Sequence, residues 1–496
     1  MEYAQAIQQV RDTVVKLRYL ECMDNLIYCD RWHVCPPGGF AYQTNVGEYL
    51  AELRSDHLVN DRVRGLVEYF AGYAPGDYAS DLDRGMVRYL TEHYQEAVQI
   101  PAELMAQLNR ANAEGQLAWE ECYKNDDFQS FKPVLKQQFE VQRRIADAID
   151  PNQPPYQVLV NRFDRGYTLT EIDRIFETLK PAVRQILEKA APASAKVDAS
   201  VLHSDLDKAA MQRLDRRLQE LLGFDQNQGM TYEMHHPVCV CVGPRDSRPS
   251  TNYGELFYNL VAIAHETGHG IYSYNSDDAV VEAGLWGGLD GAMHESQSKF
   301  YENLVLRSPQ LWQAFYPDLQ REDPHFANIP LAQVLRAFNR VKLGPRRLQA
   351  DELTVPLHVI IRYELERDYF EGKLTVDQME EAWNAKYKEF LGLEPANRQD
   401  GILQDVHWAS GCVGYFQGYV LGDIYASQFR HKLMQDVPDA YDRLARGDIG
   451  GINGWLKEHV HRYGQTYGAK ELLEKATGET MNIDYYIQHL REAFLP

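Results

Sequence analysis

The residues with the clearest capacity for chemistry are His265, Glu266 and His269, which form the pattern H-E-x-x-H. On a helix, side chains four residues apart lie on one face, so both imidazoles can reach one metal ion while Glu266 flanks them. A chance match is expected in roughly a few per hundred chains of this histidine content. Two structural histidines on an ordinary helix are the alternative, and the spacing favours a metal site with a carboxylate positioned as a base.

A catalytic zinc ion needs a third protein ligand and one open coordination position. Glu295 is the best candidate, because it lies on a separate predicted helix within His294-Glu295-Ser296-Gln297. Two histidines on one helix and a glutamate on the next form the gluzincin arrangement. Composition alone leaves Glu282 as a competing acid.

The element that must position the two histidines is the helix predicted over residues 253–271. Its apolar side chains fall on the side opposite the histidines, as a helix packed on a core requires. These are Leu256, Leu260, Ile263 and Ile271. Gly268 and Gly270 leave little bulk beside His269, which predicts the close approach of another segment.

The rest of the chain reads mostly as helices. Thr168-Leu169-Thr170-Glu171 is a capping box that predicts a helix through Leu179, ended by Pro181. Residues 236–242 are short and β-branched, which predicts a strand beside the metal helix; it is either an edge for an extended peptide or a buried structural strand. We find no repeat or linker, so we expect one large, mostly α domain over residues 1–496. Residues 1–75 would form an N-terminal helical layer and residues 76–496 the catalytic body.

Composition narrows the partners and the compartment. The net charge of −21 argues against nucleic acid or an anionic membrane as a partner. The start of the chain lacks the features of a secretory signal, and no uninterrupted apolar run approaches the length that a transmembrane helix needs. We therefore expect a soluble, cytoplasmic protein. Seven cysteines without a C-x-x-C pair indicate reduced thiols.

Six motifs follow one another along the chain. They are His236-Pro237-Val238, Asp246-Ser247-Arg248-Pro249-Ser250, His265 to His269, His294-Glu295-Ser296-Gln297, Arg346-Arg347-Leu348-Gln349-Ala350-Asp351 and Gly401-Ile402-Leu403-Gln404-Asp405-Val406-His407-Trp408. In these motifs the chain resembles the thermostable carboxypeptidase (Taq-type) family of metallocarboxypeptidases. That family carries H-P-F, D-x-R-x-T, H-E-x-x-H, H-E-S-Q/G, I-R-x-x-A-D and G-x-x-Q-D-x-H-W in the same order.

The resemblance implies a fold and an activity. The fold is mostly helical, with a deep groove, an N-terminal layer over it and a small sheet beside the active-site helix. The activity is release of single residues from peptide C-termini by a zinc-dependent, or cobalt-dependent, homodimer. Matched by motif, His265, His269 and Glu295 would hold the metal. The metal would polarise the scissile carbonyl and activate water, while Glu266 takes the proton and later delivers it to the leaving amine.

The same resemblance assigns residues to the substrate. His407 and Tyr419 would stabilise the oxyanion, the latter from a Y-x-x-G motif that ends at Gly422. Arg347 is the first choice for binding the terminal carboxylate with its guanidinium fork, Arg248 is the second, and His236 is a further substrate-binding candidate.

Three positions depart from the family pattern. Val238 replaces Phe, Ser250 replaces Thr, and Arg346 occupies the position of Ile or Val. Val238 opens space near the sheet and Arg346 adds a charge beside the proposed carboxylate site, so the departures bear on substrate preference rather than on metal binding.

Two other hypotheses about the function remain. One is an oligopeptidase or dipeptidyl carboxypeptidase of related helical fold, and the other is a peptide-binding scaffold without catalysis.

Overall fold

The N-terminal quarter of the chain is helical, as predicted. The structure is a computed structural model that describes residues 2–289 and 291–495. Its first helices are α1 (Tyr3–His33), α2 (Phe40–Leu58), α3 (Asp61–Phe70), α4 (Asp81–Gln99) and α5 (Ala102–Lys124). The apolar residues of the first helix, such as Val10, Val14 and Leu17, are buried where α1 packs on α4.

The next segment differs from the prediction at the end of one helix. It comprises α6 (Phe128–Ile149), α7 (Pro155–Asn161), α8 (Leu169–Ser194) and α9 (Lys208–Leu222). The capping box at Thr168 and Glu171 is confirmed, but α8 does not end at Pro181: it continues through Pro181 and Pro192. A proline removes one helical hydrogen bond; here the apolar side chains beyond Pro181, such as Val183 and Ile186, remain buried against the core and keep the helix intact.

The sheet is small and has three strands in the order β1-β3-β2. They are β1 (Tyr232–Glu233), β2 (Cys239–Gly243) and β3 (Asp246–Thr251). β2 is antiparallel to β3, and β1 is parallel to it. The predicted strand is confirmed, but it begins three residues later than expected, beyond Pro237, which has no N–H to donate to a ladder.

The metal helix is α10 (Leu256–Tyr274), followed by α11 (Asp278–Glu282) and α12 (Ala292–Lys299). A π-helical segment, Phe300–Leu306, continues α12 directly. The remaining helices are α13 (Pro309–Glu322), α14 (Leu331–Phe338), α15 (Val355–Phe370), α16 (Met379–Leu391), α17 (Gln417–Asp436), α18 (Ala440–Leu444), α19 (Gly450–His459), α20 (Ala469–Thr477) and α21 (Asp484–Phe494).

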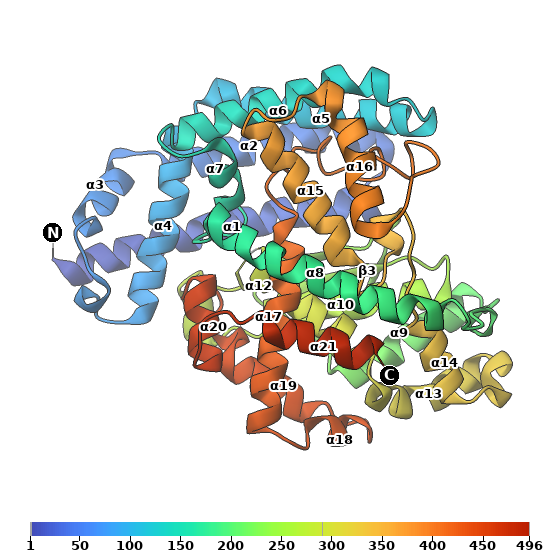
Figure 1. Cartoon of the computed structure of the whole chain (residues 1–496). Helices are drawn as coiled ribbons and strands as arrows, with labels where there is room; N and C mark the ends of the chain where they lie inside the picture. Colours follow the sequence, from blue (N-terminus) through green and yellow to red (C-terminus); the bar gives the residue numbers. More distant parts are fainter. Residues whose placement is uncertain (1, 290, 496) are drawn as a thin grey trace.

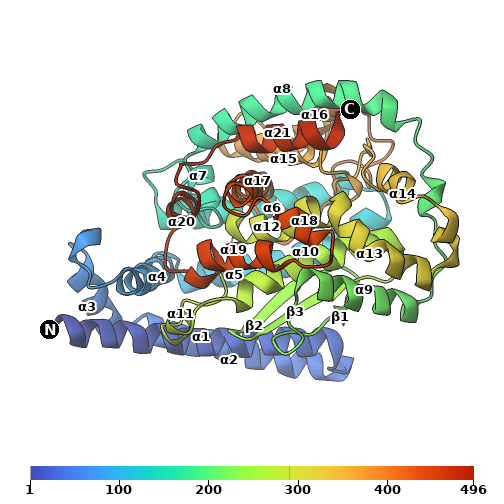
Figure 2. The same cartoon turned by 90° about the horizontal axis from the view of Figure 1, so that it is seen from below.

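The spatial arrangement places the metal helix between the sheet and the C-terminal helices. In Figure 2, α1 and α2 run along one edge of the molecule beneath the sheet, with α10 above it. Figure 1 shows α5 and α6 at the opposite side from α18 and α19. α10 packs on β3 and α12, and α12 packs on α17. Within the described residues, no helix is long and apolar enough to cross a membrane.

Candidate active site

The two histidines of α10 face a groove, while the opposite side of the helix is buried. Leu260 and Ile263 have no exposed surface, which confirms the predicted amphipathic orientation. At its N-terminus, the Glu255 carboxylate accepts hydrogen bonds from the backbone N–H groups of Phe257 and Tyr258, which fixes where the helix begins.

Glu295 is brought to the histidines by two very close helix contacts. A Cβ on Gly268 would lie 2.7 Å from the carbonyl oxygen of Gln297, so α12 can approach α10 only over a glycine. On the other side, a Cβ on Gly422 of α17 would lie 2.7 Å from the Cβ of Glu295. α12 is therefore held between two helices, and this fixes the position of the glutamate.

His265, His269 and Glu295 present ligand atoms that all lie within 4.8 Å of one another. Two imidazole nitrogens and one carboxylate oxygen are the donor set of a catalytic zinc site that keeps one position open. The set fits a divalent metal ion. Of the two acids that the sequence left open, the structure brings Glu295 to the histidines; Glu282 lies on α11 and is not part of this group.

Glu302 supports His265 and was not expected from the sequence. Its Oε2 lies 2.8 Å from His265 Nδ1 and accepts a hydrogen bond from Lys299 Nζ at 2.9 Å. A carboxylate on Nδ1 fixes the imidazole so that Nε2 is free for the metal. Glu302 belongs to the π-helical segment, and such segments are frequent at functional sites. No sequence pattern distinguishes it from the other glutamates.

Glu266 lies in the groove next to the metal ligands and is 7% exposed. Burial raises the pKa of its carboxyl to about 7, although His265 and a hydrogen bond from the backbone of Cys239 lower it. The strand β2 thus contacts the proposed base directly. A carboxylate in this position can exchange a proton with a reactant in the groove.

The groove has a volume of about 1210 Å³ and is lined by segments that are distant in sequence. Helix α1 contributes Arg18 and Tyr28, so part of the N-terminal layer does reach it. The segment before β2 contributes His236, which is exposed in the groove and stacks edge-on against His235.

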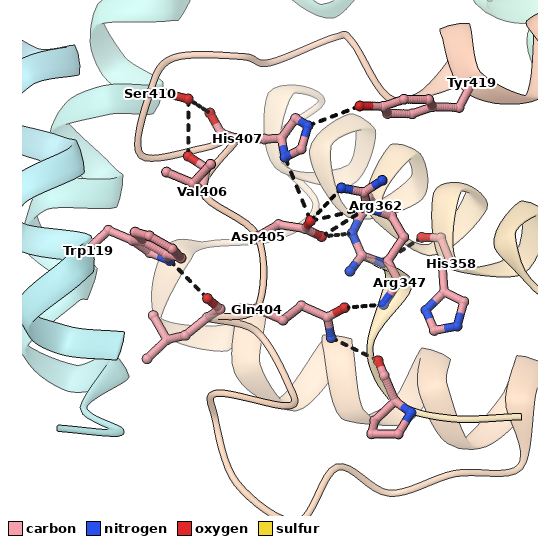
Figure 3. A network of polar contacts seen from close by, with 12 residues as sticks. Trp119, Arg347, His358, Arg362, Gln404, Asp405, Val406, His407, Ser410 and Tyr419 are labelled. Atoms are coloured by element: carbon pink, nitrogen blue, oxygen red, sulfur yellow. Dashed lines mark hydrogen bonds and ion pairs between the residues drawn. The ribbon is translucent and has the colours of Figure 1, made fainter. Parts of the chain in front are cut away.

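His407 and Tyr419 lie together at the groove. His407 Nε2 is 3.4 Å from the Tyr419 hydroxyl (Figure 3). Burial lowers the pKa of His407 to about 4, so its imidazole is neutral near pH 7. Tyr419 is on α17, three residues before Gly422, and its hydroxyl therefore depends on the same helix contact that places Glu295.

Arg347 lines the same groove from a 3-10 turn, Arg347–Gln349. Its Nε and Nη2 donate hydrogen bonds to Asp405 Oδ1 at 3.1 and 2.8 Å. Asp405 also accepts a hydrogen bond from Arg362 Nε at 2.5 Å. Sequence reasoning identified Arg347 but neither of these two partners, and the only available signal was that Asp405 belongs to the motif Gly401 to Trp408.

Arg248 takes a different position from Arg347. Its Nε and Nη2 donate to both carboxylate oxygens of Asp246, at 2.9 and 2.7 Å, and it does not line the groove. Alternate residues of a strand share one face, so Asp246 and Arg248 lie side by side on β3. The D-x-R spacing therefore forms a structural ion pair. The geometry favours Arg347 over Arg248 as the carboxylate-binding residue.

The three departures from the family pattern also have structural partners. Ser250 Oγ donates to the carbonyl oxygen of Val238 at 2.7 Å and accepts from its N–H at 2.8 Å, so two of the departures contact each other. Arg346 Nε donates to Asp400 at 2.6 Å, and the side chain does not line the groove. The additional positive charge is therefore neutralised outside it.

Comparisons with known proteins agree with this site. The family model described as "Carboxypeptidase Taq (M32) metallopeptidase" matches residues 9–494. "Carboxypeptidase 1" of Bacillus subtilis (strain 168) is 34% identical over 90% of this chain and 90% of its own length. "Thermostable carboxypeptidase 1" of Thermus thermophilus is 30% identical over 99% of this chain and 98% of its own.

The fold is shared as well. The crystal structure of an M32 carboxypeptidase from Deinococcus radiodurans R1 matches with a TM-score of 0.93 and 29% identity, covering 99% of both chains. A carboxypeptidase structure from Pyrococcus furiosus matches with a TM-score of 0.95 and 27% identity, covering 100% of this chain and 99% of that one. The expected family and the mostly helical fold with a small sheet are both confirmed, and the chain belongs to the carboxypeptidase Taq (M32) family of metallopeptidases.

Proposed function

We propose that this metallocarboxypeptidase releases single residues from the C-terminus of peptides of varied sequence. The observation that carries the proposal is that one groove is lined by the His265, His269 and Glu295 donor set, by Glu266 and by Arg347. A metal donor set with an adjacent carboxylate suits hydrolysis. An arginine in the same groove suits binding of a free carboxylate, which only the end of a peptide offers.

The positions of the residues in the groove support the following assignment of roles. A divalent metal, when bound by the donor set, supplies Lewis-acid polarisation of the scissile carbonyl and lowers the pKa of water. Glu266 takes the proton from the attacking water and passes it to the leaving amine. The Tyr419 hydroxyl and neutral His407 lie together at the groove, which supports assigning them as hydrogen-bond donors to the developing oxyanion.

We propose a substrate register in which Arg347 and Glu266, which line the same groove, act on the two sides of the terminal residue. With the terminal carboxylate on Arg347, the bond presented to Glu266 is the last one of the peptide. We assign to His236, which lines the groove near the start of β2, a contact with residues on the N-terminal side of that bond.

We also propose the identity of the metal, the cellular location and the oligomeric state. Zinc suits two imidazoles and one carboxylate, and cobalt accepts the same ligands. All seven cysteines are free thiols, which supports a reducing, cytoplasmic location. We expect a homodimer, by analogy with the family. Metal analysis of purified protein and sedimentation analysis test the metal and the oligomeric state.

Mass spectrometry of a digested peptide tests the reaction itself. An unblocked peptide of about ten residues should shorten in single steps from its C-terminus, and chelator should stop the reaction. Losses of two residues at a time or internal cuts would establish the alternative, a dipeptidyl carboxypeptidase or oligopeptidase. A peptide-binding scaffold would give no cleavage under any metal condition.

A further inference from the structure

The guanidinium of Arg347 is already bound along one of its edges. Asp405 occupies the side formed by Nε and Nη2. Nη1 has no hydrogen-bond partner among the described residues and is not one of the buried polar atoms that lack a partner, so it is open to the groove. A substrate carboxylate must therefore approach the end of the guanidinium formed by Nη1 and the free N–H of Nη2.

A second arginine lies behind the first. Arg362 on α15 is fully buried, its Nε donates to Asp405 Oδ2, and its Nη1 donates to the carbonyl oxygen of His358 at 2.7 Å. Figure 3 shows Arg347 and Arg362 converging on Asp405 from one side, with His407 above it. Arg362 does not line the groove, so it cannot contact a substrate directly.

The charges of this cluster decide what it can bind. Asp405 alone would neutralise Arg347 and leave a pair with little attraction for an anion. With Arg362 included, two guanidinium groups share one carboxylate, and one positive charge remains. His407 adds no charge near pH 7, because burial, with Arg347 nearby, holds its pKa well below that. The remaining charge is exposed at Arg347, the only one of the two arginines that reaches the groove.

The backbone of Arg347 is fixed by the residue that precedes Asp405. Gln404 Oε1 accepts a hydrogen bond from the Arg347 N–H at 2.8 Å (Figure 3). Gln404 Nε2 donates to the carbonyl oxygen of Pro345 at 2.9 Å. Consecutive residues of one motif thus hold the main chain and the side chain of Arg347. This arrangement orients a side chain before any substrate arrives.

We propose that Asp405 and Arg362 are positioning residues for carboxylate recognition: Asp405 aims the Nη1 end of Arg347 into the groove, and Arg362 keeps the cluster cationic. The inference rests on the proposed function, in which Arg347 binds the terminal carboxylate of the peptide. It assigns to two buried residues an effect on substrate selection that neither exerts by contact.

The test compares an N-blocked dipeptide with its C-terminal amide. The readout is the ratio of the two kcat/KM values, with kcat and KM reported separately. Arg362→Met removes the extra charge and leaves a neutral Arg347–Asp405 pair, so it should raise KM for the acid. We expect the ratio to fall about 10- to 100-fold, as when the outer partner of a metal ligand is removed. Arg362→Lys, which keeps the charge, should restore most of the ratio.

Asp405→Asn tests orientation. It should also reduce the ratio, and it should have no further effect in an Arg347→Met background, because it acts through Arg347. It leaves two buried cations without a counter-charge, so folding is checked by thermal unfolding, and Arg362→Met carries the test if Asp405→Asn does not fold. The matched control is Asp400→Asn, which removes the carboxylate of the neighbouring Arg346 pair outside the groove and should leave the ratio unchanged.

The outcomes separate the two proposals. If Arg347→Met leaves the ratio intact, Arg347 does not bind the carboxylate and the proposed function fails at that point. If Arg347→Met abolishes the preference for the acid over the amide but Arg362→Met keeps the wild-type ratio, the positioning proposal alone is overturned.

Discussion

The contact between Gly422 and Glu295 allows a strong test of how the fold places the third ligand. In Gly422→Ala the new Cβ would lie 2.7 Å from the Cβ of Glu295, whereas ordinary contact begins near 3.4 Å, so α17 and α12 must separate by about 0.7 Å. Metal ligands must be held within about 0.5 Å of their productive geometry. We expect overpacking to cost about 1–3 kcal/mol of unfolding free energy and the metal affinity to fall about 10- to 100-fold.

The matched control is Gly454→Ala. Gly454 is also inside a helix, α19, but an added Cβ there meets nothing within 4 Å. This variant should gain about 0.5–1 kcal/mol, because alanine suits a helix better than glycine, and should bind metal normally. Denaturant unfolding of the metal-free proteins and zinc competition against a chelator measure both quantities. Wild-type metal affinity in Gly422→Ala would refute the argument that this helix contact positions Glu295.

Three further outcomes are expected. Glu266→Gln should lower kcat about 100- to 10,000-fold while metal analysis shows an unchanged metal content, because the base is lost and the ligands remain; loss of metal instead would show that Glu266 is structural. Glu302→Gln should weaken zinc binding about 10- to 100-fold in the chelator competition, because it supports His265 Nδ1; unaltered affinity would remove that role. Burial lowers the pKa of His461 from 6.5 to about 3. Between these two pH values the unfolded protein binds more protons than the folded protein, so the free energy of unfolding should fall as the pH drops, by up to about 1.4 kcal/mol per pH unit. Denaturant unfolding of metal-free wild type and His461→Gln across this range measures the effect, and identical slopes would exclude His461 as the cause.

The catalytic centre could be predicted from the sequence because its signals are local. The spacing of His265 and His269 and the apolar stripe opposite them both follow from helical periodicity, and the structure has that helix. Gly268 marked a close approach, which α12 makes. Glu295 required the family resemblance, since helix periodicity cannot say which later acid folds back onto the site.

The residues that support the site could not be predicted, because only tertiary contacts define them. Glu302 and Arg362 have ordinary sequence surroundings, and Asp405 is marked only by its place in the motif Gly401 to Trp408. Each acquires its role from a partner between 37 and 58 positions away. The end of α8 was mispredicted for a related reason. Pro181 is a valid local stop signal, but the burial of the apolar side chains beyond it decides the outcome.

The central claim is that hydrolysis at the C-terminus depends on one metal ion held by His265, His269 and Glu295. Titration of metal-free protein with zinc, with release of the terminal amino acid followed by mass spectrometry, tests it most directly. We predict that release of single residues is absent without metal and rises to a plateau at one zinc ion per chain. Full release before zinc is added, or a plateau that Glu295→Ala reaches with the same single equivalent, would contradict the account.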